Sequence, residues 1–308
     1  PDVRSYLAKA GALLATPLER LSKMNPLSIE LYKRYKRDIT REPLEFGVNN
    51  QHMNGGLAVD IWGETSLADC YAVGEAAGTH GVTRPGGAAL NAGQVFGTRA
   101  AERIAARSGR AAASMPGDDL VAAALTDVLA ALRADSSLRA EAIRSEVQAR
   151  MSDHAGILCR PGDVAAALQA ARALNNAIAR HGIAYGSAGE ALDALQWRQM
   201  ALASEAVLTA LAFYIERGGG SRGARAICDA AGSSVPAARD LSLEAYRFLP
   251  ERLEDRNEQI LVCHQGSGFS VATRPLRGLD GGERPFFERD WPDYLTGAIY
   301  DPALDGGP

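Results

Sequence analysis

The residues best suited to chemistry lie in one glycine-rich stretch in the first third of the chain. A β-prone run ends at Val73 and leads directly into Gly74 and Glu75. A carboxylate at this point can accept hydrogen bonds from the hydroxyls of a sugar or sugar alcohol, as the acidic residue of a dinucleotide-binding fold does. His80 and Arg84 follow in the next loop. A neutral imidazole can bind a substrate oxygen or orient the loop, and a guanidinium group suits bidentate binding of a carboxylate.

The glycines of this stretch favour a bound flat ligand. The backbone could approach such a ligand closely at four positions that lack a Cβ, namely Gly78, Gly81, Gly86 and Gly87. A helix is expected from about Ala88 to about Arg107, and its N-terminal N–H groups and dipole would favour negative charge on the ligand. The alternative is a glycine-rich connection without a ligand. The glycines together with a glutamate, a histidine and an arginine favour ligand binding.

Further elements are expected to position this stretch. Pro17, Pro26 and Pro43 punctuate helices in the first forty residues. The β-prone runs 57–61 and 70–73 predict strand, turn and strand. From 117 to 217 apolar residues recur at helical spacing, which predicts a bundle of three or four helices that ends at residues 218–220. The runs 259–263 and 269–273 predict a hairpin.

Charge and cysteine content argue against several classes. The net charge of -4 provides no overall basic field for nucleic acid. The nearly uncharged stretch 120–132 is too short to span a bilayer, so no transmembrane segment is expected. The four cysteines show no C-x-x-C pair, which argues against a disulfide framework, a metal site or an iron–sulfur cluster and favours a cytoplasmic protein. The opening residues show no apolar signal and no initiator Met, which predicts a processed start or a fragment of a longer chain.

Several segments, in order along the chain, resemble motifs of the fumarate reductase, succinate dehydrogenase and L-aspartate oxidase flavoproteins. Residues 71–76 resemble the second FAD-binding motif of that family, and residues 51–56 resemble its upstream H-x-x-x-G-G segment. Residues 79–87 resemble its H-G-x-x-R-x-G-G loop, and 94–101 the helix that follows. Further matches are 147–151 with 155–157 and Arg160, Arg217 with 221–224, and Pro285, Phe287 and Glu288 near the C-terminus.

The resemblance implies an FAD cofactor and assigns roles. Glu75 would hold the ribityl or ribose hydroxyls, and the start of the following helix would lie against the flavin ring through its backbone. The cofactor-binding candidates are Gly55, Gly56, Gly74, Glu75, Gly86, Gly87, Ala89, Leu90 and Asn91. The catalytic candidates are Arg84, His80, His52 and Gln51. Arg84 matches the arginine that binds the substrate carboxylate; the alternative is a salt bridge within the loop. For His80 the alternative is a loop histidine satisfied by backbone hydrogen bonds.

Three positions depart from the family pattern. The family's substrate histidine falls on Gln51, with His52 one residue later. A shift of one residue in an extended segment turns a side chain to the opposite face, and glutamine cannot transfer a proton at neutral pH. The family's Asn-Ser pair is Ala88-Ala89 here, and the histidine after S-R-G-A is Arg225. These changes predict a divergent branch with a different substrate.

No G-x-G-x-x-G turn that leads from a strand into a helix, the form that binds the FAD pyrophosphate, is recognised in this sequence: residues 266–268 lack the third glycine, and residues 218–223, which have the spacing, follow the long helical region. The chain would therefore hold half of an FAD site. A separate subunit that carries the other lobe, a fragment of a longer protein, and a homologue that has lost the flavin are the open explanations. The partner subunit is favoured, because half a lobe would expose a large apolar face.

The fold class expected is α/β plus all-α: the C-terminal part of an FAD-binding Rossmann-like lobe, then a helical bundle and a small mixed domain. The expected regions are 1–45 (end of the substrate-capping region), 46–108 (FAD-binding lobe), 109–235 (helical domain) and 236–308 (mixed C-terminal domain). The function expected is that of an FAD-dependent oxidoreductase component in a hetero-oligomer, acting on a small carboxylate. The alternatives are a non-catalytic interaction or regulatory subunit, or else a helical binding module.

Overall fold

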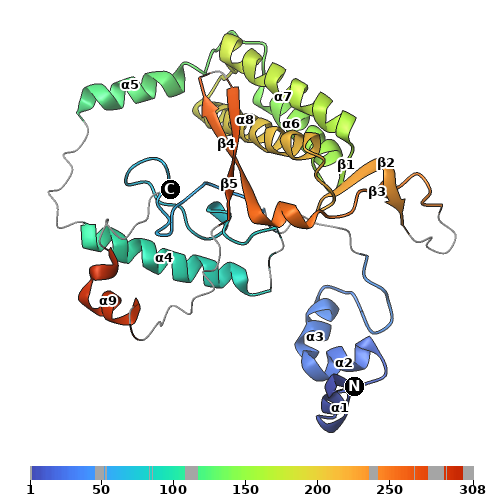
Figure 1. Cartoon of the computed structure of the whole chain (residues 1–308). Helices are drawn as coiled ribbons and strands as arrows, with labels where there is room; N and C mark the ends of the chain where they lie inside the picture. Colours follow the sequence, from blue (N-terminus) through green and yellow to red (C-terminus); the bar gives the residue numbers. More distant parts are fainter. Residues whose placement is uncertain are drawn as a thin grey trace. The chain divides into compact units, whose positions relative to one another are not determined.

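The computed structural model describes residues 2–45, 52, 54–82, 84, 86–107, 117–235, 242–266, 268–276, 288 and 290–300. The chain divides into two compact units, residues 1–52 and 53–308, and Figure 1 colours it along the sequence. The predicted catalytic residue Gln51 lies outside the described residues, as do Ser267, Pro285 and Phe287. Within the described part of the chain, no helix combines the length and the apolar character that a membrane span requires.

The described residues of the first unit form three short helices, as the prolines predicted. They are α1 (Asp2–Lys9), α2 (Pro17–Met24) and α3 (Pro26–Arg34). Pro17 and Pro26 each occupy the first helical turn, where the missing N–H costs nothing. Thr16 and Glu19 form a capping box at the start of α2. Neither α2 nor α3 buries a residue.

Three long helices in the second unit form the bundle predicted between residues 117 and 217. They are α6 (Ala140–His154), α7 (Pro161–His181) and α8 (Ala188–Glu216), and α8 packs against both of the others. Figure 1 shows them together, with α5 (Asp118–Leu129) as a separate helix before them. Two clusters of buried apolar side chains fill the bundle, one around Val164 and Leu208 and one around Ile143 and Ile183.

The end of α8 follows the predicted glycine signal. Gly218 has a φ of +78° and donates its N–H to the carbonyl of Ile215, while Gly219 donates to Tyr214. This pair of bonds is a Schellman motif, which satisfies carbonyls that the helix leaves open. A Cβ on Gly220 would overlap the carbonyl oxygen of Pro250, so the chain can turn here only with glycine.

Two small sheets follow the bundle. β1 (Leu158–Cys159) pairs in parallel with β2 (Ala226–Ser234), which pairs antiparallel with β3 (Arg247–Phe248). After the 3-10 turn η2 (Leu253–Asn257), β4 (Glu258–Gln265) and β5 (Gly268–Pro275) form an antiparallel hairpin. This confirms the hairpin predicted from residues 259–263 and 269–273. The last described elements are α9 (Trp291–Thr296) and η4 (Ala298–Tyr300).

The glycine-rich region confirms one prediction and corrects another. The predicted helix is α4 (Ala88–Arg107), preceded by the 3-10 turn η1 (Gly74–Ala76). The strands expected at 57–61 and 70–73 were wrong: of these residues only Tyr71 forms a bridge, to Glu64, and the other isolated bridge nearby, Gly56↔Ala77, lies outside both runs. A strand needs backbone partners along its length, and β-prone residues supply only a preference that depends on such neighbours.

Candidate functional site

A folded-back segment, residues 57–73, supports the glycine-rich turn. The carboxylate of Asp60 accepts hydrogen bonds from the backbone N–H groups of Trp62 and Glu64, at 2.8 and 2.9 Å. Glu64 in turn pairs with Arg107 at 2.6 Å, and Arg107 also lies 3.3 Å from the hydroxyl of Tyr71. Burial, followed by the negative charge of Glu64, raises the pKa of Tyr71. These bonds tie both arms of the segment to the C-terminal end of α4.

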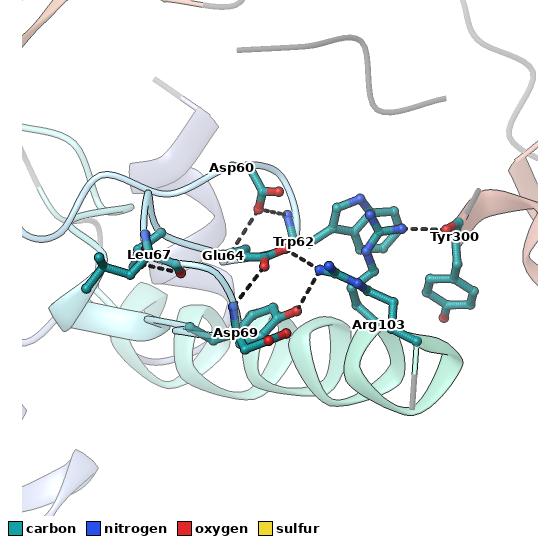
Figure 2. A network of polar contacts seen from close by, with 10 residues as sticks. Asp60, Trp62, Glu64, Leu67, Asp69, Arg103 and Tyr300 are labelled. Carbon is teal, nitrogen blue, oxygen red and sulfur yellow. Dashed lines mark hydrogen bonds and ion pairs between the residues drawn. The ribbon is translucent and has the colours of Figure 1, made fainter. Parts of the chain in front are cut away.

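Trp62 anchors the same segment on α4. Its side chain is only 4% exposed, and the guanidinium groups of Arg99 and Arg103 lie 5.0 and 5.2 Å from its ring. Figure 2 shows Trp62 beside Arg103, which donates a hydrogen bond to the main-chain oxygen of Tyr300. The ring of Tyr300 lies 5.2 Å from that of Trp62. Two cations over one indole give attraction beyond the area that the indole buries.

The segment 290–300 near the C-terminus makes a second set of hydrogen bonds to α4. Glu102 accepts hydrogen bonds from the hydroxyls of Tyr294 and Tyr300, at 3.0 and 2.7 Å. Burial, followed by the bond to Glu102, raises the pKa of Tyr300 to about 12. Both hydroxyls therefore remain protonated donors at neutral pH.

Gly55 and Gly56 pack backbone against backbone with Gly78 and form a narrow cradle beside η1. A Cβ on Gly78 would lie 2.6 Å from the backbone of Gly55 and Gly56, and a Cβ on Gly56 would overlap the carbonyl of Ala76. The N–H of Leu57 donates to that same carbonyl at 2.7 Å. Such an approach is possible only for residues without a side chain. The segment 54–57 is thus fixed against η1, which carries Gly74 and Glu75.

An open pocket lies between the loop after η1 and the N-terminal half of α4. Its volume is about 340 Å³, within the range of small-molecule sites. The lining residues are Thr79, His80, Ala88, Asn91, Ala92, Val95 and Phe96. On its other side, α4 packs closely on η1, because a Cβ on Gly74 would lie 3.4 Å from the Cα of Gly93. The cradle and the pocket therefore share one helix as a wall.

A third segment reaches the loop from the distant end of α8. A Cβ on Gly223 would lie 2.5 Å from Cγ1 of Val82 and 2.9 Å from its carbonyl oxygen. The side-chain amide of Asn54 donates a hydrogen bond to the same carbonyl. Val82 stands between His80 and Arg84 in the sequence, so both neighbours act on the loop that carries the candidate catalytic residues.

The structure brings only some of the predicted site residues together. Gly55 and Gly56 form the cradle with Gly78, Gly74 packs on α4, and His80 and Asn91 line the pocket. The remaining candidates lie outside the pocket lining: Glu75, Leu90, Gly86 and Gly87 are exposed, and Arg84 and Ala89 are half-buried. His52 is half-buried and belongs to the first unit. Every one of these functional roles stays a prediction.

Sequence reasoning gave no role to Asn54, Gly223 or Trp62. Asn54 precedes the glycine pair directly, and Gly223 lies within the S-R-G-A segment, so both stood in motifs that the sequence analysis singled out. A buried tryptophan between two glycine-rich turns gives no comparable local signal. Among the described residues, no group of His, Cys, Asp and Glu side chains could hold a metal ion.

Comparison with known proteins finds similarity over part of the chain. No family model matches it. Over 64 residues the chain is 47% identical to one subunit of the CoM/CoB fumarate reductase of Methanothermobacter marburgensis, which is 20% of this chain and 12% of that protein. Over 54 residues it is 50% identical to the L-aspartate oxidase of Halalkalibacterium halodurans, which is 17% of this chain and 11% of that protein.

Two solved structures share the fold over most of the chain. The quinol fumarate reductase FrdA of E. coli matches 91% of this chain with a TM-score of 0.64 and 20% identity, and 48% of its own length is covered. The Sdh1 complex of Mycobacterium smegmatis matches 86% with a TM-score of 0.60 and 23% identity, and 42% of its chain is covered. The chain thus spans about half the length of these solved structures.

Proposed function

Because this chain is related, over part of its length, to the flavoproteins of the fumarate reductase, succinate dehydrogenase and L-aspartate oxidase family, we propose that it is a component of an FAD-dependent oxidoreductase. FAD is the cofactor of that family. In this function a hydride passes between the flavin and a carbon of a small carboxylate substrate. The observation that carries the proposal is the glycine cradle, which meets the open pocket at α4.

The described residues would hold one side of an FAD. Gly56 and Gly78 pack backbone against backbone with no room for a side chain, which fixes the segment before the loop against the turn that carries Glu75. Glu75 is exposed beside the cradle and would accept hydrogen bonds from the ribityl or ribose hydroxyls. Main-chain N–H groups at residues 88–91, the first turn of α4, would lie against the ring. When bound, FAD supplies the group that exchanges the hydride.

The substrate would be held by the loop and not by the cradle. Arg84 would bind the substrate carboxylate with its planar guanidinium group. His80, in the wall of the pocket, would bind a second substrate oxygen or hold the loop in place. On the sequence pattern alone, Gln51 or His52 is a further candidate for a substrate ligand. A glutamine can hydrogen-bond the substrate without transferring a proton.

The other side of the FAD would come from residues outside these 308, either on a second subunit or on a longer polypeptide. The support is the length of chain matched, which is 48% of the fumarate reductase chain. The pyrophosphate site would lie in that other part, since the G-x-G-x-x-G spacing at residues 218–223 follows α8 and leads into β2 instead of joining a strand to a helix.

The first experiment tests for the cofactor. The chain is purified from its natural source with whatever co-purifies, and absorbance is recorded from about 350 to about 500 nm, where oxidised flavins absorb. A flavin spectrum that accompanies a second polypeptide, or a longer form of this chain, is the expected result. A protein without flavin in every preparation would contradict the enzyme and favour a non-catalytic interaction subunit. The departures from the family at Ala88, Ala89 and Arg225 are the observation that favours this second candidate.

The second experiment tests the substrate arginine in the flavin-bearing form. Arg84→Ala is expected to weaken the binding of malonate, a dicarboxylate probe, by about a hundredfold, because a charge-assisted bidentate contact is lost. FAD content should stay unchanged. Arg180→Ala is the matched control, since Arg180 is an exposed arginine on α7. Loss of FAD from the Arg84 variant would contradict the role given to Arg84.

A further inference from the structure

A tight turn at the end of α8, residues 221–225, is built to a fixed shape. The N–H of Arg222 donates to the carbonyl of Arg225 at 2.9 Å, and the N–H of Arg225 donates back at 3.1 Å. Gly223 occupies the first of the two central positions with a φ of +59°. Two-residue turns of this kind require a positive φ there, which glycine adopts without steric cost.

Hydrogen bonds hold the turn to three other parts of the second unit. Ser221 donates its N–H to the carbonyl of Leu249 at 3.1 Å, and its hydroxyl accepts from the N–H of Ile227 at 3.0 Å. Arg225 donates through Nε to the carbonyl of Ala155 at 3.2 Å, where α6 ends. Arg222 donates through Nη1 to the main-chain oxygen of Asp255 at 2.6 Å.

Asp255, which accepts the hydrogen bond from Arg222, is itself buried and held by several partners. It is 9% exposed, and its carboxylate lies 3.0 Å from the hydroxyl of Tyr214 on α8. Arg252 adds an ion pair to the same carboxylate at 3.6 Å. Burial, followed by the bond to Asp255, raises the pKa of Tyr214 to about 12, so its hydroxyl is a donor at neutral pH. A buried carboxylate with these partners holds η2, and thereby Arg222, in one place.

The turn at residues 221–225 packs closely against the loop that carries the candidate site residues. Gly223 lies so close to Val82 that a Cβ would meet both its side chain and its carbonyl. On that same carbonyl, Asn54 donates a hydrogen bond from the segment that forms the cradle. Val82 is therefore held between the bundle and the cradle, two residues from His80 and two from Arg84.

We infer that Gly223 is a positioning residue that sets, through Val82, where His80 and Arg84 stand for the carboxylate substrate. The inference rests on the proposed function. It gives the helical bundle a part in substrate affinity, because Tyr214, Asp255 and Arg222 hold the turn that carries Gly223.

The test compares two glycine variants in the flavin-bearing form. Gly223→Ala places a methyl group against Val82, whereas Gly266→Ala, in the β4–β5 turn, carries the same strain at a φ of +60° with no described atom within 4 Å. Malonate is titrated while the flavin absorbance is followed. Gly223→Ala is expected to raise the dissociation constant for malonate at least about tenfold, because small displacements at a site have large effects. Gly266→Ala should change it less than about twofold.

A second variant separates a positioning role from general damage. Val82→Ala removes the Cγ1 atom that the new methyl would strike but leaves the close contact with the carbonyl oxygen, so the double variant Gly223→Ala/Val82→Ala should recover part of the malonate affinity. Equal dissociation constants for Gly223→Ala and Gly266→Ala would overturn the inference, as would a double variant no better than Gly223→Ala.

Two further outcomes also test the inference. If Gly223→Ala does not fold or loses its flavin, Tyr214→Phe is tested in its place, because this change leaves the main chain of the turn intact. That variant should then raise the dissociation constant for malonate at least about threefold with full FAD content; an unchanged constant would overturn the inference. A wild-type protein that never carries flavin contradicts the proposed function, whereas a flavin-bearing protein with unaffected variants contradicts only the inference.

Discussion

Tyr214 gives the protein a stability term that depends on pH. Its hydroxyl lies 3.0 Å from both the carboxylate of Asp255 and the carbonyl of Gly220. Burial and the bond to Asp255 raise its pKa to about 12. Because the pKa is higher in the folded state, the unfolded state loses this proton first as pH rises. The stabilisation is therefore complete below about pH 10, the ordinary tyrosine pKa, and is lost as pH rises through about 12.

Tyr214→Phe should lower stability at neutral pH and remove this part of the alkaline transition. We expect a loss of about 1 kcal/mol at pH 7, from one hydrogen bond. The difference from the wild type should shrink between about pH 10 and about pH 12, since only the wild type has this proton to lose. Thermal denaturation monitored by circular dichroism measures both the loss at pH 7 and its change with pH. Tyr185→Phe, at a tyrosine that is 37% exposed, is the control. A difference that stays constant across this range would refute the assignment.

Trp62 is the side chain on which the glycine-rich segment depends most. It is 4% exposed and lies beneath two arginines and a tyrosine. Trp62→Ala should therefore destabilise the protein by about 3 to 5 kcal/mol, from the lost burial and the cavity left behind. Trp291→Ala, at a tryptophan that is 43% exposed, should cost about 1 kcal/mol or less. Chemical denaturation of both variants compares them, and equal losses would mean that Trp62 is not the anchor.

At the scale of elements, short sequence patterns correctly predicted the elements that local interactions stabilise. The bounds of α4 (Ala88–Arg107) follow from its flanking glycines, and the β4–β5 hairpin follows from two β-prone runs around a glycine. The runs at 57–61 and 70–73 carry the same local preference, but of these residues only Tyr71 forms a bridge, to Glu64. Strand formation depends on neighbours, and no window of sequence contains them.

The candidate site was predictable in its residues but not in its assembly. The glycines, His80 and Asn91 could be named from motifs, because glycine and polar side chains in such a loop suit a ligand. The approach of Gly223 to Val82 joins positions far apart in the sequence. Contacts of this kind depend on the packing of α8 and η2, which no spacing rule specifies.

Gly220, directly after the Schellman motif of α8, is a position where the structure leaves no room for any residue other than glycine. Gly220→Ala would place a Cβ into the carbonyl of Pro250, so the backbone must move and the Schellman cap must open. We expect a loss of about 3 kcal/mol or more, comparable to other forced overlaps. Gly189→Ala, near the start of α8, places its methyl 3.9 Å from Oγ of Ser187, an ordinary contact, and should be neutral or slightly stabilising. A melting temperature of Gly220→Ala close to that of the wild type would show that the turn can adapt.

At the scale of the whole molecule, one face of α4 carries apolar side chains that stay partly exposed. Leu90 is 76% exposed and Ile104 is 44% exposed. They lie on one face with Gly97, since residues seven apart occupy nearly the same side of a helix. No described atom lies within 4 Å of a Cβ built on Gly97. A glycine inside a helix costs about 1 kcal/mol relative to alanine, and nothing in the described chain explains this one.

The proposed function supplies a reason, because the rest of a flavoprotein would need close approach to this face. Gly97→Ala should then raise the stability of the 308-residue chain by about 0.5 to 1 kcal/mol, through helix propensity alone. The same change should lower the FAD content of the full flavin-bearing protein. Gly162→Ala, in the first turn of α7, also adds a methyl in open space and should leave FAD content unchanged. Full FAD content in Gly97→Ala would mean that nothing packs closely on this face, and would leave the exposed apolar groups of α4 outside the proposed flavin site.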